Sequence, residues 1–318
     1  MRYVLENEWI QAEFESVGAE LKSLKRKADG QEYMWCADPA YWSKTSPFLF
    51  PFIGKTVNME YSYNGKTWPA EKHGFGQKVA YDVAEQSDTR IVFRTKDTEG
   101  TYAKYPFHFS LDIEYVLDGE SLIENWYVTN TGDNTMYFSI GGHAAFACPR
   151  NGHGCADGRK GQECDNQERD SQGGGKRIGQ QVKLHGAEHK NIIFSLRANT
   201  LGLITEELLT LDIKDGLIAI DAHTFDNDAL IFDGEGVMAI GLCDENGKEY
   251  VRVECGAPVW GVWSMPDNGA SYVCLEPWYG LCDYEGFEGE LSERPYANAV
   301  EPGRTWKGGQ VIKVGSAL

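Results

Sequence analysis

Four stretches of this sequence place an ionisable side chain among apolar or glycine-rich neighbours, where acid–base chemistry becomes possible. They are "SPFLFPFIGKTVN" with Lys55, "EKHGFGQ" with His73, "GGHAAFACP" with His143 and "CLEPWYG" with Glu276. A fifth stretch, "FDNDALIFDG", carries Asp226 and Asp228 before an apolar run. Ionisable groups removed from water have displaced pKa values, and general acids and bases depend on such displacement.

Glu276 is the most informative of these side chains. Residues alternate between the two faces of a strand, so Glu276 is expected to share a face with Tyr272 and Cys274. The sequence predicts that Pro277 and Trp278 end this strand and supply an aromatic wall. A carboxyl group beside apolar and aromatic groups tends toward a raised pKa, which suits a general acid or base.

Each of these residues also has a plain structural interpretation. His143 alone is typical of a core histidine, His73 of a turn histidine with a satisfied hydrogen bond, and Glu276 of an acceptor at a strand end. Lys55 alone is typical of an exposed lysine after a glycine turn, and Asp228 of a turn cap. No spacing rule joins these residues, which meet only if the fold brings them together. The residues alone therefore leave both interpretations open.

Strand patterns run along the whole chain. In "FHFSLDIEYVL", one face carries Phe109, Leu111, Ile113, Tyr115 and Leu117. Other short β-branched and aromatic runs are separated by turn signals such as "YNGK", "LDGE" and "DENGK". Helical periodicity is scarce, and "ITEELL" suggests one short helical turn. These patterns predict an all-β protein, a large antiparallel sandwich with few short helical turns.

Residues 150–177 differ in composition from the rest of the chain. They contain no Leu, Ile, Val, Phe, Tyr or Trp, so ordering them would bury little apolar surface. Strand patterns on both sides favour an insertion within one domain over a linker between two. We expect a single domain over residues 1–318, with a polar surface insertion at about 150–190.

Composition and charge exclude several classes of protein. The chain has 318 residues and a formal net charge of −18, which makes it a poor partner for nucleic acid or an anionic membrane. It has neither a signal-peptide pattern at the N-terminus nor an apolar run of membrane-spanning length, so a cytoplasmic location is expected. The spacing of His153 with Cys148, Cys155 and Cys164 matches no zinc pattern, and no metal is expected.

Several stretches, taken in order, resemble the aldose 1-epimerase (galactose mutarotase-like) family, in its bacterial mutarotase-like branch. They are "GAELKSL" (18–24), "MWCADPAYWSKTSPFLFPFIGK" (34–55), "HGFGQ" (73–77), "GGHAAFACP" (141–149), "DNDALIF" (226–232), "VWGVWSMP" (259–266), "CLEPWYG" (274–280) and the closing "EPGRTWKGGQVIKV" (301–314). Each motif alone is a weak signal, whereas their shared order is specific. The resemblance covers nearly the whole chain apart from the polar insertion, and it implies a β-supersandwich fold.

The resemblance implies an isomerase without a cofactor, which interconverts the α and β anomers of a hexose by opening the sugar ring. It places the catalytic base at Glu276 and the acid at His143, which is expected to arrive protonated with a pKa near neutrality. It makes His73 a second histidine that bonds a sugar oxygen, and Asp228 an acceptor for a sugar hydroxyl. Asp226 fits that last position nearly as well.

The implied partner is a small-molecule sugar, and the protein is expected to be a monomer or homodimer. Lys55 stands where the family commonly has arginine, and lysine cannot make the two-pronged contact of arginine. Since Lys55 is the one clear lysine of the candidate site, the sequence predicts a preference for neutral aldoses over their 6-phosphates.

Three alternatives remain at this stage. A hexose-6-phosphate 1-epimerase needs a basic pocket, for which Lys55, Lys72 and Lys78 are the local candidates. A non-catalytic carbohydrate-binding protein can share the same fold. A glycosidase needs two carboxylates flanking the scissile bond, a role that Glu276 and Asp228 can be drawn to fill.

Overall fold

The structure is a computed structural model, and it describes residues 1–148, 180–266, 270–315 and 318. Strands dominate these residues, in which helix is confined to α1 (Glu99–Tyr102) and to the 3-10 turns η1 (Val57–Met59) and η2 (Leu291–Glu293). None of the described helices has the length and apolarity that crossing a bilayer requires. The expected all-β class with few short helical turns is confirmed.

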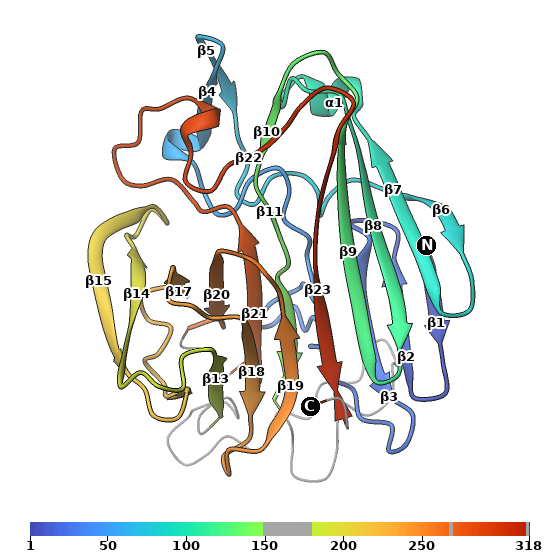
Figure 1. Ribbon diagram of the computed structural model, residues 1–318, viewed down its shortest axis with the longest axis vertical. Helices are drawn as coiled ribbons and strands as arrows, with labels where there is room; N and C mark the ends of the chain where they lie inside the picture. Colours follow the sequence, from blue (N-terminus) through green and yellow to red (C-terminus); the bar gives the residue numbers. More distant parts are fainter. Residues whose placement is uncertain (149–179, 267–269, 316–317) are drawn as a thin grey trace.

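A nine-stranded antiparallel sheet forms one layer of the molecule (Figure 1). In spatial order its strands are β16 (Leu217–Ala219), β13 (Gln181–His185), β18 (Ala239–Cys243), β19 (Glu249–Glu254), β23 (Thr305–Val314), β9 (Ser121–Asn130), β8 (Phe109–Asp118), β7 (Arg90–Lys96) and β6 (Asp82–Gln86). All five residues that the sequence assigns to the inner face of β8 are buried, which confirms the alternation seen there.

Two further sheets form the opposing layer. One is the three-stranded sheet β1 (Arg2–Glu6), β2 (Ile10–Glu15) and β3 (Glu20–Arg26). The other has seven strands, in the order β11 (Ile140–Gly141), β21 (Tyr272–Tyr279), β20 (Val259–Trp263), β17 (Leu230–Asp233), β14 (Ile192–Ala198) and β15 (Ile204–Asp212), with β12 (Ala144–Ala147) also paired to β21. Two small antiparallel pairs complete the described strands. One is the hairpin of β4 (Glu60–Tyr63) and β5 (Lys66–Pro69), and the other joins β10 (Met136–Phe138) to the distant β22 (Asn298–Val300).

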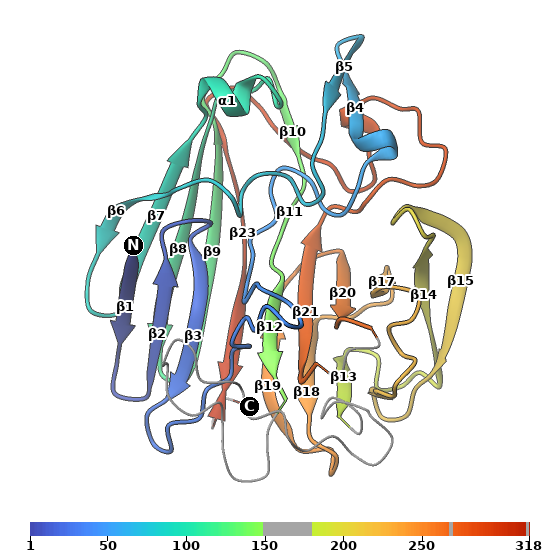
Figure 2. The same ribbon diagram turned by 180° about the vertical axis from the view of Figure 1, so that it is seen from behind.

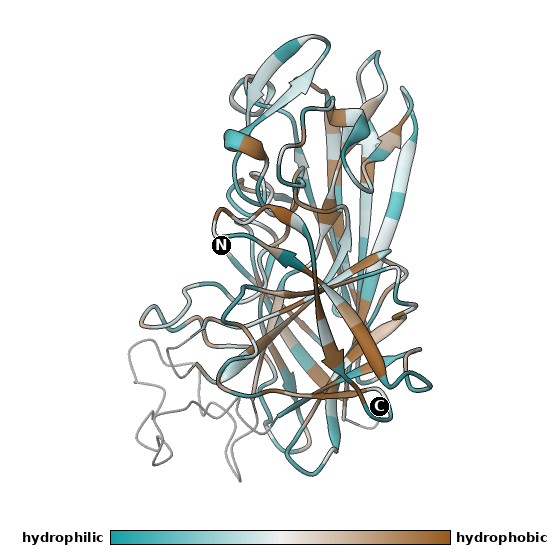
Figure 3. Ribbon diagram, turned by 90° about the vertical axis from the view of Figure 1, so that its left-hand side faces the viewer, coloured by the Kyte–Doolittle hydropathy of each residue, from teal (hydrophilic) through white to brown (hydrophobic). Residues whose placement is uncertain are grey.

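Aromatic side chains join the two layers. Figure 2 shows β1–β3 lying over β7 and β8, where the Phe14 and Tyr115 ring centroids are 4.4 Å apart. On the other side of the molecule, the ring of Trp126 from β9 packs edge-on against Tyr279 from β21 at 6.2 Å. In Figure 3 hydrophobic residues are concentrated in the strands, and hydrophilic residues are prominent in the loops at their ends. The buried apolar area between the layers is the main source of stability in such a fold.

The expected insertion extends less far than the composition suggests. Residues 149–179 lie outside the described part of the chain, so the prediction for 150–177 has no structural counterpart here. The described remainder of the expected insertion, from residue 180 to about 190, is not a polar surface segment. It contains β13, which pairs with both β16 and β18 and buries Val182 and Leu184 completely. The alternating "QVKLH" is the sequence signal for this strand.

The helical turn expected at "ITEELL" is also wrong. These residues belong to β15, an edge strand that pairs antiparallel with β14 over most of its length. Leucine and glutamate favour helix locally, but Ile204 is fully buried at the start of the strand, and pairing to the sheet overrides the local preference.

The two faces of the seven-stranded sheet have different roles. Along β21, Val273 and Leu275 point into the main core between the layers. Cys274 and Trp278 point to the outer face, where they pack in separate small clusters. Segment 34–55 covers this outer face, with backbone bridges from Met34 and Leu49 to β12 and β11. The outer face under this covering segment is where the candidate site lies.

Candidate active site

His143 and Glu276 are neighbours across two antiparallel strands. Gly141 pairs with Trp278 on β21, and Ala144 pairs with Leu275. The register between these pairs places His143 directly opposite Glu276. Two residues that lie far apart in the sequence are thus brought together by strand pairing alone.

The strand pairing with β21 is interrupted at Gly142 and His143 for a local reason. Contrary to the sequence prediction, β21 does not end at Pro277 but continues through it to Tyr279. The Gly142 N–H donates to the Pro277 carbonyl oxygen at 3.2 Å, but Pro277 has no N–H with which to continue the ladder. The pairing is interrupted between β11 and β12, so His143 sits in a short irregular step between two paired strands.

The glycines before His143 are required by close approach. A Cβ on Gly141 would lie 2.7 Å from the Pro277 carbonyl oxygen, and one on Gly142 would lie 2.8 Å from the Gln310 side-chain nitrogen. Real Cβ atoms do not make such contacts. At Gly141 the obstacle is backbone, so only glycine lets the chain pass this close to β21, whereas at Gly142 the neighbouring atom is the end of the Gln310 side chain.

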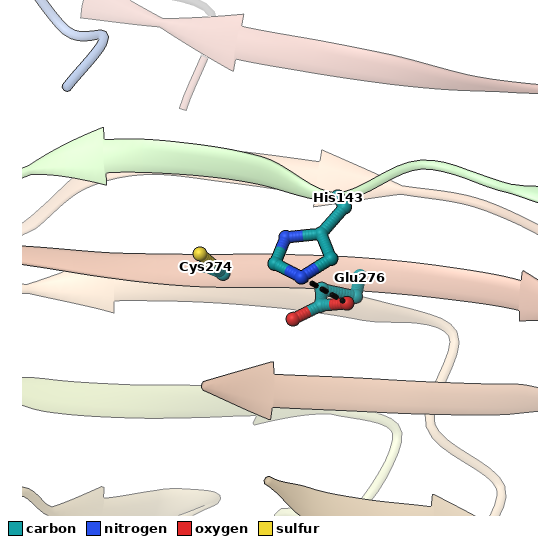
Figure 4. A group of neighbouring side chains, drawn as sticks. All are labelled: His143, Cys274 and Glu276. Carbon is teal, nitrogen blue, oxygen red and sulfur yellow. Dashed lines mark ion pairs between the residues drawn. The ribbon is translucent and has the colours of Figure 1, made fainter. Parts of the chain in front are cut away.

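His143 and Glu276 form a buried pair. The His143 Nε2 lies 3.3 Å from the Glu276 Oε2. Figure 4 marks this ion pair with a dashed line. Glu276 is 1% exposed and His143 8% exposed. Neither the Glu276 Oε2 nor the His143 Nδ1 has a hydrogen-bond partner among the described residues, so polar capacity remains for a ligand.

Burial displaces both pKa values in the direction of the neutral forms. Desolvation lowers the pKa of His143 to about 3. Desolvation raises the pKa of Glu276 well above its ordinary value, and the negative charge of Asp228 adds to this. The expectation of a His143 pKa near neutrality is therefore wrong. Burial thus favours the neutral form of both groups, imidazole for His143 and carboxylic acid for Glu276.

This pair lines a cavity of about 330 Å³, at the lower end of the range of small-molecule sites. The residues around it come from the sheet, the covering segment and the loops nearby: Trp42, Lys44, Pro47, Leu49, Gly54, Lys55, Lys72, His73, Gln77, His143, Ala198, Gly202, Asp228, Ala229, Ile231, Trp263, Glu276, Trp278 and Cys282. All five side chains that the resemblance assigns to the site are in this set. The structure therefore brings them together.

Aromatic rings enclose His143. Trp42 stacks on the imidazole with centroids 5.1 Å apart and an angle of 26°, and Trp263 meets it edge-on at 5.8 Å. Trp42 also stacks on Tyr272, with centroids 5.6 Å apart. These rings exclude water from the histidine and present flat apolar surface to the cavity. Sequence reasoning did not single out Trp42 or Trp263, although both lie within stretches that carry the resemblance.

His73 is held in one neutral tautomer. The His73 backbone adopts a positive φ of 61°, and its backbone N–H donates to the Gly54 carbonyl oxygen at 2.8 Å. In return the Gly54 N–H donates to the His73 Nδ1 at 3.1 Å. Desolvation and the nearby His143 lower the pKa of His73 well below its ordinary value. With Nδ1 accepting, the ring proton lies on Nε2, which is then a hydrogen-bond donor.

Asp228, rather than Asp226, lines the cavity. Its backbone has a φ of 71°, and one of its carboxylate oxygens accepts from the Ala229 N–H. Asp226 instead contacts the exposed His223 at 2.8 Å. The positive φ at Asp228 turns the chain, so that Asp226 and Asp228 have different surroundings. A sequence pattern does not show this turn, which is why the sequence left both aspartates as candidates.

Cys274 makes a third potential metal ligand beside the pair. Ligand atoms of His143, Cys274 and Glu276 all lie within 4.8 Å of one another, and zinc accepts this donor set (Figure 4). Cys274 is fully buried, however, and does not line the cavity. The wall itself offers the histidine and the carboxyl group, which suffice for proton transfer.

The pKa of His143 predicts a pH dependence of stability. An unfolded histidine binds a proton near pH 6.5, whereas folded His143 binds one only near pH 3. Because the unfolded chain binds more protons in this window, the free energy of unfolding falls as the pH drops from about 6.5 toward 3. Urea unfolding of the wild type and of His143→Asn measures this. The wild type is expected to lose stability more steeply over this window, and equal slopes would contradict the burial argument.

The fold is found in other solved structures. A galactose mutarotase related enzyme from Lactobacillus acidophilus superposes with a TM-score of 0.84 at 29% identity, covering 100% of this chain and 98% of that chain. A galactose mutarotase-like protein from Lactobacillus casei ATCC 334 superposes with a TM-score of 0.85 at 21% identity, covering 99% of this chain and 100% of the other, and this likeness concerns the fold. The class defined by the fold is the galactose mutarotase-like β-sandwich.

Sequence comparisons give the family. The aldose 1-epimerase family profile matches residues 1–192, which is more than half of the chain. The chromosomal protein LacX of Lactococcus lactis subsp. lactis is 27% identical over 309 residues, or 95% of each chain. The chain belongs to the aldose 1-epimerase family. The resemblance on which the sequence analysis relied is confirmed.

Proposed function

We propose that this protein is a mutarotase, which interconverts the α and β anomers of an aldose of hexose size. One observation carries the proposal: the buried His143–Glu276 pair, with its atoms 3.3 Å apart, lies on the wall of a cavity of about 330 Å³. Anomer exchange needs one proton removed from the C1 hydroxyl and one delivered to the ring oxygen. An imidazole and a carboxyl group side by side supply both functions, since one delivers a proton while the other takes one up.

In the proposed reaction Glu276 accepts the C1 hydroxyl proton and His143 donates its proton to the ring oxygen. The C1–O5 bond breaks, the aldehyde rotates about C1–C2, and closure on its other face reverses both transfers. This polarity needs a protonated His143 and an ionised Glu276, whereas burial favours the neutral form of both groups. A sugar hydroxyl that donates a hydrogen bond to the Glu276 carboxylate favours the charged form of that group. The proton then passes from Glu276 to His143, whose facing atoms are 3.3 Å apart.

The other wall residues have supporting roles in this proposal. The Nε2–H of His73 donates to a sugar oxygen, and Asp228 accepts from a sugar hydroxyl. The rings of Trp42 and Trp263 pack against the apolar face of the sugar and keep water from the open-chain aldehyde. No cofactor takes part in these steps.

Polarimetry on freshly dissolved sugars tests the proposal. The optical rotation of α-glucose and α-galactose should relax as a single exponential whose rate increases in proportion to the protein concentration. The panel should include pentoses and charged aldoses. Binding of sugars without acceleration of any of them would favour the non-catalytic carbohydrate-binding alternative.

Asp228 and Asp226 provide a matched pair of variants. Asp228→Asn is expected to raise KM about tenfold, because a hydrogen bond to a charged group is worth about 1.5 kcal/mol. Asp226→Asn should leave KM unchanged, because Asp226 does not line the cavity. Steady-state kinetics on the best substrate measures both, and the reverse ranking would assign the sugar contact to Asp226.

A further inference from the structure

Three lysines line the cavity, Lys44, Lys55 and Lys72. Sequence reasoning recognised one clear lysine at this site and considered Lys72 and Lys78 nearby, but it missed Lys44. Lys78 is absent from the wall, so the structure changes both the number and the identity of the lysines that face a ligand.

The lysines of the cavity wall differ in their ion pairing from two lysines just outside the cavity. Lys78 and Lys104 both pair with Glu71, each at 2.5 Å. Within the described part of the chain, by contrast, no carboxylate forms an ion pair with Lys44, Lys55 or Lys72. In a chain with a net charge of −18, where carboxylates are abundant, this local lack of partners leaves three ammonium groups available.

The balance of charge on the wall is positive. Its carboxyl groups are Asp228 and Glu276. Even with both of these groups ionised, the three lysines outnumber them, and burial further disfavours the charged form of Glu276. The cavity wall is therefore net positive although the whole chain is net negative, and a positive region attracts anions.

The lysines reach the cavity from separate directions. Lys44 and Lys55 come from the covering segment, whereas Lys72 comes from the turn that also carries His73. The charge of Lys72 acts on His73, His143 and Glu276, which places it toward the reactive pair. The stem of Lys55 lies against Gly202, where an added Cβ would be 3.4 Å from its Cδ. A neutral sugar requires no such group of cations.

We propose that the aldose bound here carries an anionic substituent, a phosphate or a carboxylate, that Lys44 and Lys55 hold while the anomeric carbon faces His143 and Glu276. This inference rests on the proposed mutarotase function. It replaces the expectation that neutral aldoses are preferred. Lysine is suited to the task because its ammonium group acts as a compact point charge for such anions.

The test compares anomer exchange in neutral, phosphorylated and carboxylated aldoses at fixed ionic strength. NMR exchange measurements on glucose, glucose 6-phosphate and glucuronate, with the galactose series in parallel, give kcat/KM after the uncatalysed rate is subtracted. We expect at least a tenfold preference for one anionic class over the neutral sugar. The phosphate and uronate arms identify which anion the lysines hold.

Two variants separate the wall lysines from general charge effects. Lys44→Gln should lower the ratio of anionic to neutral kcat/KM by tenfold or more. Lys78→Gln makes the same change of charge outside the cavity and should leave that ratio unaltered. A ratio that responds equally to both variants would overturn the proposal.

The outcomes distinguish the two proposals. If no aldose exchanges faster with the protein present, the mutarotase function fails, and this inference fails with it. If neutral sugars exchange as fast as both anionic classes or faster, the mutarotase function stands and the anionic substrate is wrong. A preference that persists in Lys44→Gln and in Lys55→Gln would also exclude the lysines as its cause.

Discussion

Replacing Glu276 with glutamine is expected to lower kcat/KM for anomer exchange by about 10²–10⁴-fold, the usual contribution of one general acid–base group. Glutamine keeps the size of the side chain but can neither take up nor release the proton at working pH. Near-UV circular dichroism should be unchanged, because the substitution removes no core packing. Polarimetry on the best substrate measures the loss.

His143→Asn is expected to cause a loss of similar size. In the proposed reaction the two groups act together on one sugar, so the double variant should lose little more than either single variant, as is found for residues that act as a unit. Glu285→Gln, an exposed carboxylate outside the cavity wall, is the matched control and should retain full activity. A folded Glu276→Gln protein with near wild-type turnover would remove Glu276 from the mechanism.

Replacing Arg294 with alanine is expected to lower the free energy of unfolding by about 3–5 kcal/mol, the cost of leaving a buried charge without its partner. The Arg294 Nε lies 2.6 Å from the Asp283 Oδ1, and both side chains are almost completely buried. The other Asp283 oxygen accepts from the Val57 N–H at 3.0 Å, and the Asp283 N–H donates to the Lys55 carbonyl oxygen. This pair therefore anchors the segment that carries Lys55.

An exposed pair of the same type is the control. Arg94 pairs with Asp112 at the surface, and its side chain is 45% exposed. Arg94→Ala should cost less than about 1 kcal/mol, because solvent screens such pairs. Urea unfolding measures both variants. Adding Asp283→Asn to Arg294→Ala should recover part of the loss, and equal effects of Arg294→Ala and Arg94→Ala would contradict the burial argument.

Much of the site was accessible from the sequence, but through the order of its motifs rather than through any single residue. The side chains that the family resemblance assigns to the site all line one cavity, namely His73, His143, Glu276, Lys55 and Asp228. Their protonation was not accessible in this way. A histidine framed by glycines suggests an acid with an ordinary pKa, and only the aromatic rings packed around it reveal the desolvation that lowers that pKa.

The errors in the fold concern two short segments. In "ITEELL" the local helical preference is weak compared with the hydrogen bonds that a neighbouring strand supplies, whereas the alternation of "QVKLH" agrees with the strand but lies close to the polar run 150–177. Each became a strand because another strand lay beside it. Pro277 is the converse case, in which a residue that normally ends a strand is accepted because the irregular step at Gly142 and His143 lies opposite it.

The sequence by itself determined the β class, the buried face of β8 and the residue types needed for acid–base chemistry, because alternation and side-chain chemistry are local properties. Only the tertiary structure decided that His143 faces Glu276, that Asp228 rather than Asp226 reaches the cavity, and that Lys44 joins its wall. Those facts depend on strand register, on a positive φ and on the path of a covering segment. Each of them is set by contacts between residues distant in the chain, which no local pattern encodes.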